Sequence, residues 1–447
     1  MGSFILHRRP RHVPPIAVGG AGAVVFTEDG RRILDGSGGA AVSCLGHGHP
    51  AVVAAILEQA AALSYAHSSF FSSAPAEELA QHLVGSRPGG LSRAYFVSGG
   101  SEATEAAIKL ARHFFIQRRE PKRSHFISRR GSYHGATIGA LALSGNRWRR
   151  NGYEPLLPND VTHVSPAYAY RDQAEGESEQ AYCDRLIEEI EVAFRRIGPE
   201  RVAAFVAEPV VGATLGAVAA PPGYFERVKQ LCRRHGALLI MDEVMCGMGR
   251  TGTRHAWEQE AAAPDIQMIA KGLAGGYQPI GAVLLAEHVA DQVEAGADFA
   301  HGHTYMAHPI ACAAALAVQR TVDDQNLLSA VTCAGQVLRE GLVAAFGDHP
   351  HVGDIRGRGL LYAIEIVERR DTKRPFASTL NVSTRIKDEA FRMGLACYPG
   401  NGCAGDAGGD HILLAPPFIT SADELDEIVT TLARAVESVT VEVRASS

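Results

Sequence analysis

A short, mostly apolar run from Ile266 to Ala270, which leads into Lys271 and then glycine, constrains the fold more than any other stretch. A mostly apolar run of this length predicts a strand buried on both faces, as in a sheet covered by helices. A lysine that ends such a strand either carries its ammonium group back to solvent or has a use for a desolvated amine. Because a desolvated lysine attacks carbonyl carbons readily, Lys271 is a candidate Schiff-base residue.

A second buried-strand pattern, from Ala237 to Met241, leads directly into Asp242 and Glu243. Asp242 lies 29 residues before Lys271, a spacing that allows one crossover between neighbouring parallel strands. Pyridoxal phosphate uses such a pair, because a lysine holds its aldehyde as an imine while a carboxylate keeps its ring nitrogen protonated. With these residues the chain resembles the class III aminotransferases, a branch of the fold-type I pyridoxal-phosphate enzymes, from about Gly22 to Val439.

Composition excludes several other classes of protein. The formal net charge of −6 gives no electrostatic reason to expect nucleic acid, and the basic clusters at 147–150 and 369–374 are expected to be solvated surface. No apolar run approaches the length of a membrane span, and the N-terminus lacks a signal-peptide core. The eight cysteines show no metal-type spacing. We therefore expect a cytoplasmic protein with reduced thiols, without a membrane partner.

The order of the predicted elements indicates two domains in a chain of 447 residues. Residues 46–320 are predicted to form a large α/β domain, with a mostly parallel sheet flanked by helices as in fold-type I enzymes. Residues 1–45 are predicted to form an N-terminal arm and part of a smaller α+β domain, including a hairpin that turns at Asp29-Gly30. Residues 321–447 complete that smaller domain, with helices expected near 327–346, 378–393 and 422–437.

A glycine-rich turn joins a predicted strand, Arg93 to Val97, to a helix that starts near Ala103. The turn, Ser98-Gly99-Gly100-Ser101-Glu102, is typical either of an anion site at a helix N-terminus or of an ordinary capped helix. The run that begins at Gly100 matches the phosphate cup of the class III aminotransferases. The resemblance implies that Gly100 and Ser101 contact the cofactor phosphate.

Another buried strand, Val202 to Ala207, ends in Glu208, because Pro209 prevents it from continuing in the centre of a sheet. Glu208 is therefore expected at the carboxyl edge of the parallel sheet, where ligands bind in open α/β folds. The resemblance implies that this glutamate supports the cofactor pocket by polar contacts.

Tyr133 and His134 follow the predicted strand His125 to Ser128. A tyrosine at a strand end either packs in the core or stacks on the ring of a ligand. The resemblance implies that Tyr133 stacks on the cofactor ring and that His134 belongs to the same pocket. It also implies that Val244 packs against the opposite face of the ring.

The resemblance extends to quaternary structure. In the run His303-Thr304-Tyr305, Thr304 matches a family threonine that reaches the cofactor phosphate of the neighbouring subunit. This match implies a homodimer with shared active sites.

Two further motifs resemble a metal site and a dinucleotide-binding site, but each lacks a feature that such a site needs. The Gly-His-Gly-His turn at 46–49 offers two imidazoles, but no third ligand has suitable spacing, so we predict no metal site. The G-x-G-x-x-G run at 247–252 lacks the apolar helix that a dinucleotide-binding fingerprint should open. We expect a loop there.

The resemblance implies a transaminase that moves an amino group from an amine, ω-amino acid or amino acid to a keto acid such as pyruvate. Related folds also host racemases, epimerases, an aminomutase and a decarboxylase, and a non-catalytic cofactor-binding protein is a remoter alternative. The chain departs from the family where many relatives carry a carboxylate-binding arginine: Tyr398 and Leu413 occupy two such places. Either another arginine binds the keto acid, or its carboxylate is held in another way.

Overall fold

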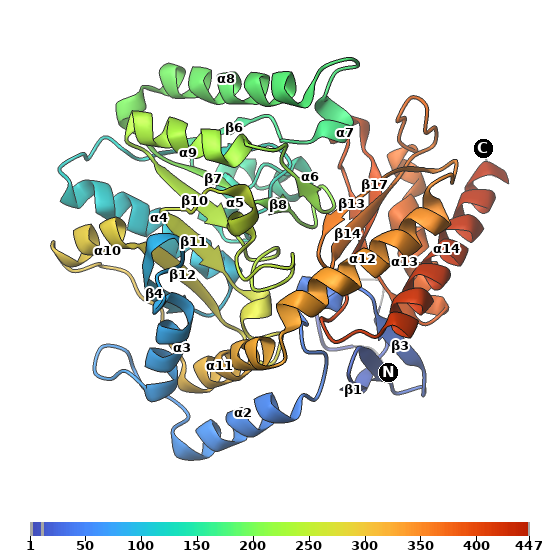
Figure 1. The fold of residues 1–447 in the computed structure, drawn as a ribbon, viewed down its shortest axis with the longest axis horizontal. Helices are drawn as coiled ribbons and strands as arrows, with labels where there is room; N and C mark the ends of the chain where they lie inside the picture. Colours follow the sequence, from blue (N-terminus) through green and yellow to red (C-terminus); the bar gives the residue numbers. More distant parts are fainter. Residues whose placement is uncertain (1–2, 10–12, 446–447) are drawn as a thin grey trace.

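The computed structural model describes residues 3–9 and 13–445. The predicted N-terminal arm therefore falls partly outside the described residues, at 1–2 and 10–12, as does the end of the predicted small domain at 446–447. Figure 1 shows a large sheet surrounded by helices beside a smaller sheet that α12, α13 and α14 cover.

The large sheet has seven strands in the order β4-β12-β11-β10-β7-β5-β6. Their bounds are β4 (Leu91–Val97), β5 (His125–Arg129), β6 (Val161–Val164), β7 (Val202–Ala207), β10 (Leu238–Asp242), β11 (Ile266–Ile269) and β12 (Gly281–Ala286). Neighbouring strands run parallel, except that β12 is antiparallel to both β11 and β4. Every residue of β7, β10, β11 and β12 is buried. The predicted mostly parallel sheet is confirmed, including the direct pairing of β10 with β11.

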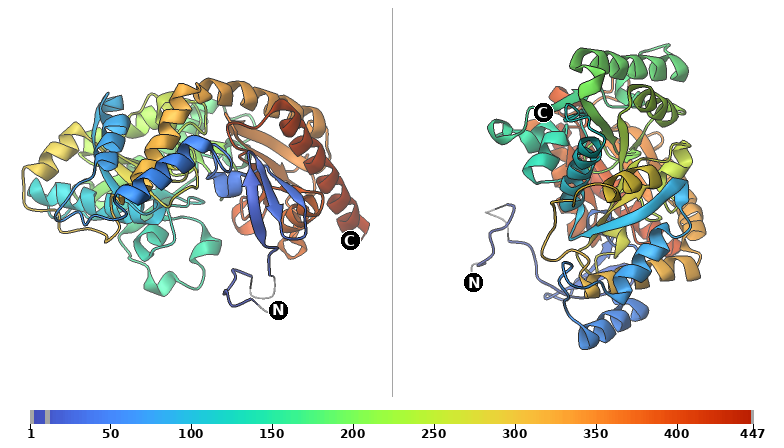
Figure 2. Two further views of the ribbon diagram at one scale, coloured as in Figure 1. Left: turned by 90° about the horizontal axis from the view of Figure 1, so that it is seen from below. Right: turned by 90° about the vertical axis from the view of Figure 1, so that its left-hand side faces the viewer.

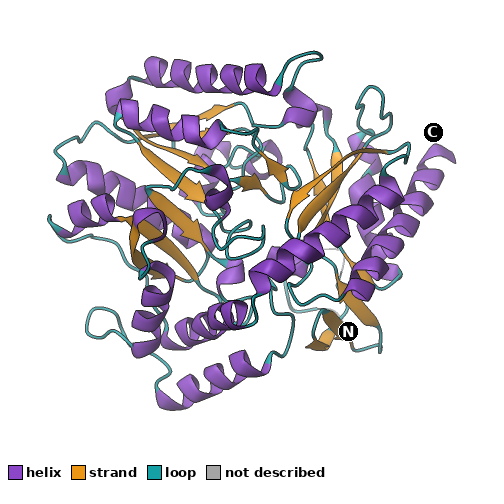
Figure 3. Cartoon of the chain, in the orientation of Figure 1, coloured by secondary structure: helices purple, strands orange, loops and turns teal. Residues whose placement is uncertain are grey.

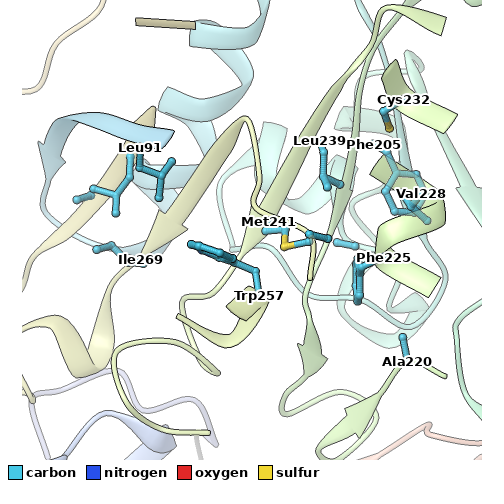
Figure 4. Packing of buried hydrophobic residues seen from close by; sticks show 14 of the residues in the cluster. Leu91, Phe205, Ala220, Phe225, Val228, Cys232, Leu239, Met241, Trp257 and Ile269 are labelled. Atoms are coloured by element: carbon cyan, nitrogen blue, oxygen red, sulfur yellow. The ribbon is translucent and has the colours of Figure 1, made fainter. Parts of the chain in front are cut away.

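Helices cover both faces of this sheet (Figure 3). Alternate residues of each strand face opposite cores: Leu239 and Met241 pack on one side, and Leu238 and Ile240 on the other. Figure 4 shows the first side, where Phe225, Val228 and Cys232 of α9 lie against the strands. The helices of that first core are α3 (Ala74–Val84), α8 (Glu179–Ile197), α9 (Tyr224–His235) and α11 (Pro309–Asp324). The opposite core is closed by α4 (Gly100–Gln117) and α10 (Glu287–Glu294).

Two smaller sheets contain the chain's N- and C-terminal segments. One has the order β13-β14-β17-β16, and the other has the order β1-β2-β3-β15. Their bounds are β13 (Val352–Arg358), β14 (Leu361–Ile366), β16 (Tyr398–Asn401), β17 (Asp410–Leu414), β1 (Ala17–Ala21), β2 (Val24–Thr27), β3 (Arg32–Asp35) and β15 (Leu395–Ala396). The predicted hairpin is β2 and β3, and β15 adds to it in parallel. Figure 2 accordingly shows the N-terminal strands, in blue, beside the C-terminal helix, in red.

Helices α12 (Leu327–Phe346), α13 (Val382–Arg392) and α14 (Ala422–Ala445) complete this part of the molecule. They share one apolar core with the small sheets, so residues as distant in sequence as Leu34, Leu338 and Ile428 pack in the same cluster. The exact domain boundaries, 45/46 and 320/321, remain predictions.

One described helix, α12, is long and apolar enough to cross a membrane by length and composition alone, with a mean hydropathy of 1.2 over its 18-residue window. In this structure, Leu327, Val331 and Leu338 on one side of α12 are buried in the shared core. A helix that buries an apolar stripe against its own domain passes the same test.

The remaining elements are short or peripheral. They are α1 (Gly38–Ala41), α2 (Pro50–Ala62), α5 (Ile138–Leu143), α6 (Arg147–Arg150), α7 (Ala169–Asp172), β8 (Val210–Val211) and β9 (Val218–Ala219). The G-x-G-x-x-G run at 247–252 lies in turns, and no α-helix starts there, as the sequence predicts.

Candidate active site

Three neighbouring strands of the large sheet bring the predicted polar residues to its carboxyl edge. Asp242 is the last residue of β10, Glu208 comes directly after β7, and Lys271 lies just beyond β11. Because the three strands are parallel neighbours, their ends meet at one place. A cavity of about 790 Å³ opens there, and all three side chains line it. This volume suits a cofactor together with a small substrate.

The strand before Lys271 is shorter than predicted. It ends at Ile269, and Lys271 begins a 3-10 turn (Lys271–Leu273). The buried side-chain amide of Gln319 donates hydrogen bonds to the carbonyls of Gly272 and Leu273 in this turn, at 3.0 and 2.9 Å. Lys271 has a φ of +45°, in the left-handed region that side chains other than glycine seldom adopt. Such a conformation costs about 1–3 kcal/mol and persists only where surrounding contacts fix it.

Burial lowers the pKa of the half-buried Lys271, although the negative charges of Asp242 and Glu208 oppose the shift. A lower pKa raises the fraction of unprotonated amine, which is the nucleophilic form.

Asp242 forms a buried pair with His134. Nδ1 of His134 lies 2.8 Å from Oδ2 of Asp242, and the amide of Val244 donates to the other oxygen at 3.0 Å. Burial alone would lower the pKa of His134, but the hydrogen bond to Asp242 and the charges of Glu208 and Asp242 raise it overall. The pair with Asp242 therefore favours the protonated form of the buried His134 imidazole.

The loop that carries His134 is fixed by neighbouring hydroxyl groups. The His134 amide donates to Oγ of Ser144 at 2.8 Å, and Oγ1 of Thr104 donates to the His134 carbonyl at 2.5 Å. Hydrogen bonds to both the backbone amide and the backbone carbonyl of His134 therefore fix the position from which its imidazole contacts Asp242.

Glu208 is only 6% exposed, and one of its oxygens, Oε2, has no hydrogen-bond partner among the described residues. The other oxygen accepts the amide of Tyr133 at 3.4 Å. Burial raises the pKa of Glu208 to about 7, with His134 and Arg129 opposing the shift and Asp242 adding to it. A buried acceptor left without a partner indicates that another polar group belongs beside it.

Gly100 and Ser101 form the first turn of α4 and line the same cavity. A β-carbon at position 100 would lie 2.9 Å from Cγ1 of Val244, so only glycine allows this approach. Oγ of Ser101 accepts the amide of Ala136 at 3.0 Å, which links α4 to the loop after Tyr133. The free amides of a helix start and its dipole favour an anion here.

Tyr133 and Val244 both line the cavity, as the sequence leads one to expect. Thr304 does not belong to its lining in this single chain. Thr304 lies in an exposed loop, where its carbonyl accepts the hydroxyl of Tyr65 at 2.9 Å. Its role toward a partner subunit remains a prediction.

Sequence reasoning misplaced one residue and left another uncertain. The basic cluster at 147–150 was expected to be solvated surface, but Arg149 lines the cavity, with its guanidinium carbon 4.4 Å from the centre of the Tyr133 ring. Of the two residues at places where relatives carry arginine, Tyr398 lines the cavity and Leu413 is fully buried in a separate apolar cluster. Of the two, only Tyr398 is therefore in a position to contact a substrate.

Comparisons with known proteins agree with this geometry. A model of the class III aminotransferase family matches residues 6–436. An uncharacterized aminotransferase of Schizosaccharomyces pombe is 43% identical over 437 residues, which cover 98% of this chain and 95% of the relative.

Solved structures support the same family. A thermostable (S)-enantioselective omega-transaminase from Thermomicrobium roseum superposes with a TM-score of 0.91 at 33% identity, over 98% of this chain and 96% of that one. The omega-transaminase from Pseudomonas jessenii in complex with PMP gives a TM-score of 0.90 at 33% identity, over 97% and 94% of the two chains. The chain belongs to the class III aminotransferases, a family dependent on pyridoxal phosphate, and it is a transaminase.

Proposed function

We propose that this transaminase binds pyridoxal 5'-phosphate at Lys271 and moves an amino group from an amine, ω-amino acid or amino acid donor to a keto acid such as pyruvate. The observation that carries the proposal is the meeting of Lys271 with the His134–Asp242 pair in one cavity at the carboxyl edge of the sheet. The likeness to the omega-transaminases of Thermomicrobium roseum and Pseudomonas jessenii supports transamination.

The residues present fit this cofactor. The α4 start would hold its phosphate, and Val244 and Tyr133 would enclose its ring from opposite faces. Asp242, already paired with His134, would hold the proton of the ring nitrogen. The unpartnered Oε2 of Glu208 leaves an acceptor for a polar group of the ligand.

When bound, pyridoxal phosphate supplies an aldehyde for the amino group and a ring that accepts electrons from the bond being broken. The Lys271 amine is suited to holding that aldehyde, because burial lowers its pKa. Nζ of Lys271 would also act as the base that takes the proton from the donor carbon that bears nitrogen. His134 would hold the Asp242 carboxylate in place through their hydrogen bond.

We further propose a homodimer with shared active sites, in the cytoplasm, acting without nucleic acid or membrane. The exposed position of Thr304, outside the cavity of its own chain, is compatible with a contact to the partner's phosphate. All eight cysteines are free, as expected of a reducing compartment.

Borohydride reduction followed by peptide mapping tests the cofactor site. The expected pyridoxyl mass lies on Lys271, and a label on another lysine would contradict the assignment. A panel of amine donors and keto acid acceptors, followed by cofactor absorbance, tests the reaction. A transaminase leaves the cofactor aminated after the donor alone, whereas a racemase or a binding protein does not.

Mixed dimers test the shared site. When a Lys271→Ala chain is paired with a Thr304→Ala chain, a threonine acting in trans leaves one site intact and places both lesions in the other. Half of the sites should then keep wild-type cofactor affinity. The loss of a charge-assisted hydrogen bond weakens binding at a lesioned site by about tenfold to a hundredfold. Loss of every high-affinity site, or a catalytically complete monomer, would rule out the shared site.

A further inference from the structure

Arg149 is a cationic side chain in the active-site cavity to which neither the family resemblance nor the mechanism above gives a role. It is half-buried and lines the cavity together with Lys271 and Tyr398. Its guanidinium carbon lies 4.4 Å from the centre of the Tyr133 ring and 5.7 Å from that of Trp148.

The short helix α6 holds Arg149 in this place. Oδ1 of Asn146 caps the helix by accepting the Arg149 amide at 3.2 Å. The next residue, Arg150, anchors the other end: its guanidinium donates to the carbonyls of Ala142 and Ser144 at 2.8 and 3.0 Å. It also pairs with Glu154 at 3.0 Å. Arg149 therefore projects from a backbone that is fixed on both sides.

In the part of the chain that the structure describes, no acidic group of the cavity pairs with Arg149. Asp242 is paired with His134, and burial raises the pKa of Glu208 toward its neutral form. Among the described residues, no carboxylate pairs with Arg149 and its side chain donates no hydrogen bond. A guanidinium that stacks on an aromatic ring uses its face, while its five N–H donors point outward in the plane. Those donors match a planar carboxylate, which accepts two parallel hydrogen bonds.

The cavity lacks an arginine from the small-domain sheet that contributes Tyr398 to its lining. Tyr398, from β16, stands where many relatives carry an arginine, and no arginine of the β13–β17 sheet is among the described lining residues. The other lining arginine, Arg8, is exposed on the N-terminal segment. Of the two arginines that line the cavity, Arg149 is the one that is half-buried and that lies on a capped helix.

We propose that Arg149 binds the carboxylate of the substrates, so that this transaminase selects keto acid acceptors and carboxylate-bearing donors over simple aldehydes and amines. This inference rests on the proposed function and names the substrate class for it. Arg149 would act by binding and orientation, without taking part in proton transfer.

Matched substrate pairs test the role of Arg149 in the holoenzyme. Pyruvate and acetaldehyde differ as acceptors only by the carboxylate, and 4-aminobutyrate and butylamine make the corresponding donor comparison. Half-reactions are measured for wild type, Arg149→Gln and Arg149→Lys, with Arg147→Gln on the same helix as the matched control and Arg8→Gln as the competing assignment. Calorimetric titration with butyrate, which has no reactive group, measures carboxylate binding apart from chemistry.

We expect Arg149→Gln to lower kcat/KM for pyruvate and 4-aminobutyrate by about tenfold to a hundredfold, as for a lost charged hydrogen bond. The rates with acetaldehyde and butylamine should stay within about threefold of wild type. Butyrate affinity should fall by a similar factor. Arg149→Lys should retain part of the kcat/KM for the carboxylate substrates and part of the butyrate affinity, because lysine keeps the charge but not the paired donors. Arg147→Gln should match wild type.

Equal losses on both members of each pair would overturn the proposal, because they would indicate a purely structural role through Tyr133. No loss in Arg149→Gln, or a selective loss in Arg8→Gln, would overturn it as well. If the wild type aminates no substrate in the panel, the proposed function fails instead, and the butyrate titration still decides whether Arg149 binds a carboxylate.

Discussion

Two buried glutamates in this molecule have opposite electrostatic surroundings. Glu208 lies at the carboxyl edge of the large sheet with one oxygen unpartnered, and burial raises its pKa to about 7. Glu365, on β14, is fully buried but accepts Nε of Arg171 at 2.6 Å and Nη1 of Arg356 at 2.7 Å, with the Tyr168 hydroxyl as a third donor. Burial would raise the pKa of Glu365 too, but the two arginines lower it overall.

The two surroundings differ in how far the protein itself pairs the carboxylate. Glu365 is paired with two arginines, and Arg356 also donates to the carbonyl of Gly216 at 2.6 Å, which joins β13 to the segment between β8 and β9. Glu208 has no hydrogen-bond partner at its Oε2 among the described residues. We therefore expect changes in the first cluster to affect stability, and changes in the cavity to affect chemistry.

The largest expected effect is on the chemical step. Asp242→Asn keeps the shape of the side chain but removes the carboxylate that pairs with His134 and that we propose holds the proton of the cofactor ring nitrogen. The half-reaction with an amino donor should slow by about 10²- to 10⁴-fold, measured by stopped-flow absorbance. The unfolding midpoint serves as a control for folding. A half-reaction near the wild-type rate would contradict the role of Asp242.

Next in size is a loss of stability from the cluster around Glu365. Glu365→Gln leaves the guanidinium groups of Arg171 and Arg356 without their charge partner, and breaking a buried pair costs about 3–5 kcal/mol. Urea unfolding should report this loss, while kcat/KM of the folded enzyme stays within about threefold of wild type. Glu188→Gln, which breaks the exposed pair with Arg195, is the control and should cost no more than about 1 kcal/mol. Equal losses of unfolding free energy in the two variants would show that the buried cluster stabilises the fold no more than an exposed ion pair.

The smallest of these effects is a pH dependence of opposite sign for the two glutamates. Because the folded pKa of Glu208, about 7, exceeds its ordinary value of 4.5, its contribution to stability is present below pH 4.5 and is lost as pH rises through 7. Because the pKa of Glu365 is lowered in the folded protein, its contribution to folding stability is present above pH 4.5 and is lost as the pH falls below 4.5. In cofactor-free wild type, the raised pKa of Glu208 should lower the free energy of unfolding by roughly 3 kcal/mol between pH 5 and 8. The Glu208→Gln variant should not show this decrease. Parallel curves for wild type and variant would contradict the raised pKa of Glu208.

Much of the cavity was predictable because its residues follow local patterns. Apolar runs before Asp242 and Glu208 dictate strands buried on both faces, and parallel strands bring their carboxyl ends together whatever lies between them. The position of Lys271 was nearly right. The strand before it stops at Ile269, because the backbone at Ala270 leaves the ladder with φ −162° and ψ −146° before the turn begins.

The remainder depends on contacts that no local pattern encodes. The cluster around Glu365 joins Arg171 to a strand 194 residues later in sequence, and neither segment indicates the other. The antiparallel direction of β12 and the order of the seven strands likewise follow from tertiary packing. Arg149 was misjudged because three arginines among four residues at 147–150 are typical of surface, whereas tertiary packing brings Arg149 to the cavity.

The left-handed backbone of Lys271 has an evolutionary consequence. Glycine would adopt that conformation without strain, so selection for stability alone would drift position 271 away from lysine. A random library screened only for folding and solubility should therefore lose the lysine that we propose holds the cofactor.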